Sequence, residues 1–123
     1  MNYSGYQHYK QQSVSTMTKS EMLQLLYQEM LKRLTRAEMA IDENNEEIFE
    51  QSVTRATEIV QYLMDTLDMK YSVSQELMRM YQFFLYQLSR IQASKKKELI
   101  VELKPLVKEL QETFLEAGKR SGY

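Results

Sequence analysis

Apolar residues recur at alternating spacings of three and four along four stretches of this chain, and this repeat constrains the fold more than any other feature. Such spacing places the apolar side chains on one face of an α-helix. Breaks in this repeat near Asn44, Met69 and Ala93 separate the four stretches. Three Gly and one Pro among 123 residues are too few for the many turns of an all-β domain, so composition also indicates helices.

The boundaries of the four helices are predicted from their capping residues. The first is expected to begin at a capping box, Thr18-Lys19-Ser20-Glu21, and the second after Asn44-Asn45. The third is predicted to begin at a second capping box, Ser72-Val73-Ser74-Gln75, and the fourth follows Ala93-Ser94 and ends at Gly118. Links of two to five residues force neighbouring helices to run antiparallel. The predicted fold is therefore all-α, an antiparallel up-down-up-down four-helix bundle.

The apolar stripe of each helix is expected to form the core. The predicted core residues are Leu23, Leu26/Tyr27, Met30, Leu34, Ala37 and Ile41; Phe49, Val53, Ala56, Val60, Leu63 and Leu67; Val73, Leu77, Met80/Tyr81, Phe84, Leu88 and Ile91; and Leu99, Leu103, Leu106/Val107, Leu110, Phe114 and Ala117. Pro105 falls inside the last stretch, roughly opposite Leu103 and Leu106, which favours a modest kink over a break.

The chain divides into a bundle, residues 18–118, a short tail, residues 119–123, and an N-terminal segment, residues 1–17. This N-terminal segment has almost no aliphatic residues and no acidic ones. It is predicted to be either a disordered leader or a flexible strap lying on the bundle. In the second interpretation its tyrosines cover apolar surface on the bundle. They recur at every third position and are Tyr3, Tyr6 and Tyr9.

The composition argues against an enzyme or a metalloprotein. There is no Cys, and His8 is the single His, so thiol chemistry, His-rich metal sites and imidazole catalysis lack their residues. We predict no catalytic residue, no metal and no cofactor. The formal charge of -1 provides no field for nucleic acid, and the triplet Lys95-Lys96-Lys97 alone is a weak signal for it. No apolar run approaches the ~18 residues that cross a bilayer, so we expect a cytoplasmic chain without membrane insertion.

Several large apolar residues lie away from the core stripes and are candidates for binding a partner. Grouped apolar residues on a surface usually mark a partner site, and the nine Met of this chain favour an adaptable one. Two alternatives remain open: these positions belong to a wide core, or they form a homo-oligomer interface of a structural bundle. The candidates are Met22 and Leu25 on the first helix, Ile48, Ile59 and Tyr62 on the second, and Met78 and Leu85 on the third.

The residues at the junction of the second and third helices resemble those of the FliS family of flagellar secretion chaperones. The junction reads Leu67-Asp68-Met69-x-Tyr71-x-Val73-Ser74-x-x-Leu77-x-x-Met80-Tyr81-x-Phe83. The Leu25-Leu26-Tyr27 run and Thr16 before the first helix also match, so the resemblance spans about Tyr9 to Phe114. The chain is similar to a divergent member, because Gln28-Glu29-Met30 stands where many members have Asp-Gly-Ala.

This resemblance implies a function without catalysis. Members of the family bind the disordered C-terminal segment of flagellin in apolar grooves of a helical bundle, which prevents premature polymerisation in the cytoplasm before export. The N-terminal strap is implied to occupy part of that surface until flagellin arrives. Further partners among flagellar export or regulatory proteins, and a homodimer without cargo, are compatible with the same surface.

Overall fold

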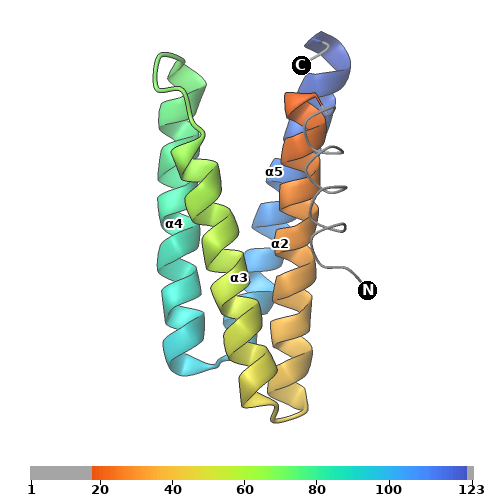
Figure 1. Cartoon of the computed structure of the whole chain (residues 1–123), viewed down its shortest axis with the longest axis vertical. Coiled ribbons are helices and arrows are strands. Elements are labelled where there is room, and N and C mark those ends of the chain that lie inside the picture. The colour runs from red at the N-terminus through yellow and green to blue at the C-terminus, as the bar shows by residue number, and fades with distance from the viewer. Residues whose placement is uncertain (1–17, 122–123) are drawn as a thin grey trace, which may run out of the picture.

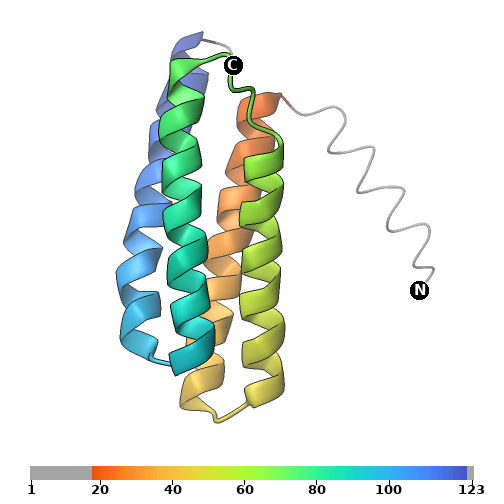
Figure 2. The same ribbon diagram turned by 90° about the vertical axis from the view of Figure 1, so that its left-hand side faces the viewer.

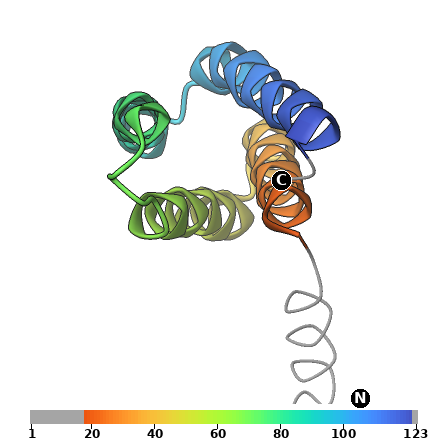
Figure 3. The ribbon, with the colours of Figure 1, turned by 90° about the horizontal axis from the view of Figure 1, so that it is seen from above.

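The computed structural model describes residues 18–121 and contains four antiparallel helices within them. These are α2 (Lys19–Asp42), α3 (Glu46–Asp65), α4 (Ser72–Ser94) and α5 (Lys97–Ser121). Consecutive helices run in opposite directions along one long axis (Figures 1 and 2). Seen from above they form a ring in which each helix packs on two neighbours (Figure 3), and the contact between α4 and α5 is the smallest of the four. The predicted all-α four-helix bundle is confirmed.

The first two helices begin at the caps expected from the sequence. The Thr18 hydroxyl accepts a hydrogen bond from the Glu21 backbone N–H at 3.1 Å, and the Glu21 carboxylate accepts one from the Thr18 N–H at 3.4 Å. These reciprocal bonds satisfy two N–H groups that the helix leaves without partners. At the start of α3 the Asn45 side chain accepts from the Ile48 N–H at 3.1 Å. Local side chains therefore define both helix starts.

The core consists mainly of the predicted stripes. Two buried tyrosines, Tyr27 of α2 and Tyr81 of α4, join their hydroxyls across the bundle at 2.6 Å, so that each buried hydroxyl has a partner. The buried apolar residues are Leu23, Tyr27, Met30, Leu34, Ala37, Ala40, Phe49, Val53, Ala56, Val60, Leu63, Leu77, Tyr81, Phe84, Leu88, Ile91, Ile100, Leu103 and Val107.

The predicted start of α4 is wrong in its register. Tyr71 is the N-cap and makes no side-chain capping bond, and Ser72 is already helical, so the Ser72–Gln75 capping box does not form. Val73 is 52 % exposed, whereas Ser74 is 5 % exposed. The reason is that the buried residues of α4 are separated alternately by three and four positions. Continued backwards from Leu77, this spacing reaches Ser74, and Val73 then lies about 100° around the helix from the buried face.

The stripe of α5 is also shifted in part. Ile100, which was not among the predicted core residues, is fully buried, while Leu99 is half-buried and Leu106 is exposed. Ile100, Leu103 and Val107 follow one alternation of three and four, and this face points into the ring. Where two adjacent apolar residues compete, the regular repeat predicts the buried one.

Two helix ends differ from their predicted positions. α3 ends at Asp65, so Leu67 lies in the following loop, half-buried and packed against the core. α5 continues through Gly118 to Ser121, since a single Gly costs a helix only about 1 kcal/mol. Pro105 is exposed inside α5, which runs on without a break.

Candidate functional site

A surface groove runs between α2 and α3 at the end of the bundle where α2 begins and α3 ends. Its volume is ≈ 350 Å³. Its lining combines five apolar side chains with four charged ones and comes from both helices. The lining residues are Met22, Leu25, Leu26, Glu29 and Arg33 of α2, and Arg55, Glu58, Ile59 and Tyr62 of α3. We call this part the apolar half of the α2–α3 groove.

The apolar half brings together four residues predicted as partner-binding. Met22 and Leu25 from α2 face Ile59 and Tyr62 from α3 across it. Leu25 is 38 % exposed and Tyr62 is 48 % exposed, so both side chains remain available to a partner. Ile59 also packs partly against the core. The two helix flanks that the sequence marked separately thus form one surface.

A second hollow continues the groove toward the α2–α3 turn. It has a volume of ≈ 520 Å³ and shares Arg33, Arg55 and Glu58 with the apolar half. Ile48, a fifth predicted residue, lines it. Its remaining lining residues are Arg36, Glu50, Gln51, Ser52 and Thr54. We call this part the polar half of the groove.

The boundary between the two halves carries two weak ion pairs. Arg33 Nε lies 4.0 Å from Glu29 Oε2, and Arg55 lies 3.8 Å from Glu58. Both distances exceed the range of a hydrogen bond. The Glu29 Oε2 atom is buried and has no hydrogen-bond partner among the described residues. These four residues were not among the predicted site residues, although pairs three or four apart on a helix are the usual signature of such contacts.

The other predicted site residues lie elsewhere. Met78 and Leu85 are half-buried on α4, which does not border the α2–α3 groove, and Leu85 packs partly against the core. Tyr3, Tyr6 and Tyr9 fall outside the described residues. The partner-binding role of all these residues remains a prediction.

A further hollow of ≈ 520 Å³ lies at the same end of the bundle, between the α3–α4 loop and the interior. Tyr71 and Val73 line this hollow, together with buried residues such as Leu77 and Tyr81. This hollow was not predicted, because Val73 was expected to lie in the core. The alternation of three and four from Leu77 onwards would have identified Val73 as an outward residue.

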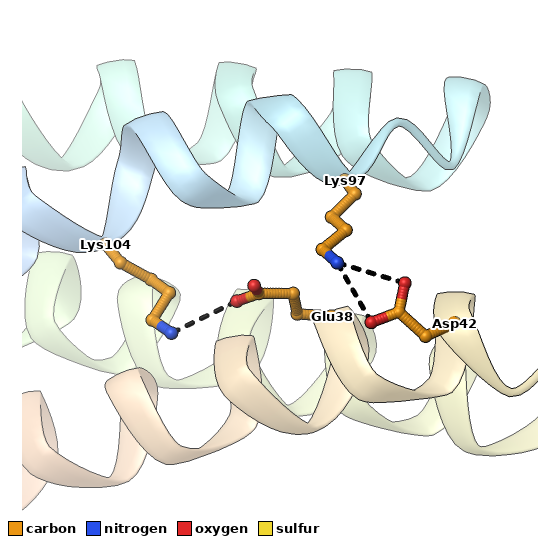
Figure 4. A network of polar contacts seen from close by, with 4 residues as sticks. All are labelled: Glu38, Asp42, Lys97 and Lys104. Carbon is orange, nitrogen blue, oxygen red and sulfur yellow. Dashed lines mark hydrogen bonds and ion pairs between the residues drawn. The ribbon is translucent and has the colours of Figure 1, made fainter.

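Three lysines, from the C-cap of α4 and the first turns of α5, form ion pairs with acidic residues of α2 and α3. Lys97 Nζ lies 2.9 Å from an Asp42 carboxylate oxygen and Lys104 Nζ lies 3.1 Å from Glu38 (Figure 4), while Lys95 pairs with Glu46. The hydrogen bond and attraction from Asp42 raise the pKa of Lys97 above its ordinary value. These lysines therefore connect helices within the bundle.

Among the described side chains, those of residues 18–115, no group of three His, Asp or Glu is arranged to hold a metal ion. None of the four helices described is both long enough and apolar enough to span a membrane.

Comparison with known proteins identifies a family for this chain. The family described as Flagellar protein FliS matches residues 2–121. No curated protein matches the chain. FliS proteins form a chaperone family rather than an enzyme family, and their partners are flagellar proteins. The chain therefore belongs to the FliS family, and its general role is that of a flagellar export chaperone.

Proposed function

We propose that this protein binds the C-terminal segment of flagellin in the α2–α3 groove and holds it in the cytosol before export. The observation that carries the proposal is the apolar half of the groove, where Met22, Leu25, Ile59 and Tyr62 from two helices face one another. Exposed apolar residues grouped in this way fit the apolar face of an amphipathic helix. The apolar half continues into the polar half, with which it shares Arg33, Arg55 and Glu58.

Binding here would prevent flagellin from polymerising too early. A segment that is disordered when free gives up conformational entropy on folding into the groove, and burial of its apolar residues compensates that cost. The bundle acts by binding alone, so no ATP and no cofactor are needed. Release then requires only that the export machinery compete for the segment.

Titration of the protein with a synthetic flagellin C-terminal peptide tests this function. We expect a binding heat in calorimetry, together with NMR shifts concentrated at Met22, Leu25, Ile59 and Tyr62. Absence of both signals at high micromolar peptide would refute the proposal.

Met78 and Leu85 on α4 are proposed to contact only a cargo long enough to extend beyond the groove. Their NMR signals should therefore shift with a longer flagellin fragment and not with the short peptide.

Residues 1–17 are proposed to act as a strap that competes with cargo. They join the bundle at Thr18, one turn before Met22, and therefore beside the apolar half. Deleting residues 1–17 is expected to tighten peptide binding about threefold or more, because the groove is then fully available. Thermal unfolding should be almost unchanged, since Thr18 still caps α2. Equal affinity with and without the segment would contradict the strap.

A structural bundle that associates with itself is the alternative function. Phe83 and Tyr86 on α4 favour it, because they are exposed and lie outside the groove. Sedimentation would show concentration-dependent dimers if this surface joined two copies. A monomer at all concentrations would exclude this alternative.

A further inference from the structure

Three arginines line the polar half of the groove without a hydrogen-bond acceptor among the described residues. They are Arg33 and Arg36 of α2 and Arg55 of α3. Glu29 and Glu58 lie near two of them, at 4.0 and 3.8 Å, too far for hydrogen bonds. Arg36 forms no ion pair with any side chain of residues 18–115. The guanidinium N–H groups of this hollow are therefore available to a ligand.

The acidic residues of the groove leave Arg36 as the charge without a counterpart. Glu29 stands beside Arg33 and Glu58 beside Arg55, which balances the boundary between the halves. The Glu50 carboxylate accepts a hydrogen bond from the Gln92 side chain of α4 at 3.3 Å. It therefore points toward α4 and not toward the arginines of α2. The polar half therefore suits an anion, and a guanidinium group binds a carboxylate best, through two parallel hydrogen bonds.

A C-terminal segment brings one carboxylate whatever its sequence, at its own chain end. If the segment docks as a helix, the negative end of its dipole lies at the same place. The arginines stabilise both the carboxylate and the negative end of the dipole when that end of the segment reaches them. The apolar residues of the segment then lie against Leu25 and Tyr62.

We propose that the polar half binds the free α-carboxylate of the docked segment, through Arg36 together with Arg33 and Arg55. This inference rests on the proposed function and adds to it the direction of the bound chain. The segment runs parallel to α2, with its C-terminus toward Ile48. Tyr62 and Arg55 are seven residues apart on α3, about 10 Å at 1.5 Å per residue. The apolar anchors are therefore expected within about the last two to three helical turns of the segment.

Two forms of one flagellin C-terminal peptide, with a free carboxylate and with a C-terminal amide, provide the test. On the intact protein we expect the amide to bind about tenfold more weakly, the usual value of a charge-assisted hydrogen bond. In Arg36→Gln this difference should largely disappear. Arg79→Gln, which removes the same charge from an exposed position on α4, is the matched control and should keep the full difference.

A spin label near the peptide C-terminus gives a second readout of direction. It should broaden NMR signals around Ile48 and leave those around Met22 sharp. The opposite pattern would overturn the proposed direction and, with it, the carboxylate site.

Three further outcomes would overturn the inference. Equal affinity of acid and amide would show that the carboxylate contributes nothing. A difference that persists in Arg33→Gln, Arg36→Gln and Arg55→Gln would place the carboxylate elsewhere, and loss of affinity on neutralising only side-chain carboxylates would assign the site to those. Failure of both peptides to bind would instead refute the proposed function itself.

Discussion

Replacing Tyr62 with Ser is expected to weaken binding of the flagellin C-terminal peptide by about 2 kcal/mol, or about 30-fold. Tyr62 lines the apolar half of the groove and is half-exposed, so its ring can bury against a partner. The same exposure means that bundle stability should fall by no more than about 1 kcal/mol. Calorimetric titration measures the first effect and thermal unfolding measures the second.

Tyr86→Ser is the matched control for this experiment. Tyr86 is 61 % exposed on α4, and its only described ring contact is with Arg90, at 5.9 Å from the ring centroid to the guanidinium carbon. Removing it deletes the same ring from a surface outside the groove, so peptide affinity should not change. Weak binding by Tyr86→Ser with normal binding by Tyr62→Ser would move the partner surface to α4, beside Met78 and Leu85.

Replacing Phe84 with Ala is expected to lower the free energy of unfolding by about 3–5 kcal/mol. Phe84 is fully buried, and its removal leaves a cavity that the surrounding residues fill only in part. A domain of this size has about 5–15 kcal/mol of stability in total, so much of it would be lost. Urea unfolding followed by circular dichroism measures the change.

Phe83→Ala provides the comparison for the core prediction. Phe83 is the neighbouring residue of the same type but is 41 % exposed, with its ring 6.3 Å from that of Phe84. Its loss should cost about 1 kcal/mol or less. Similar losses for both variants would show that the α4 stripe is assigned to the wrong face.

The sequence alone predicted the number, order and direction of the helices, because these depend on local features. The caps at Thr18 and Asn45 need only nearby side chains, and the core repeat needs only helix geometry. The sequence could also predict the excess of apolar residues on the helix flanks. It failed locally at Val73, where an apolar residue one position from the stripe was taken for a member of it.

Only the tertiary structure decided which flanks form one site. Met22 and Leu25 meet Ile59 and Tyr62 because α2 and α3 pack side by side, while Met78 and Leu85 belong to a helix that does not border the groove. It likewise brought the arginines of α2 and α3 to one hollow, although Arg36 and Arg55 are nineteen positions apart in the chain. The periodicity of a helix specifies its own faces, whereas the angle at which two helices pack determines which faces meet.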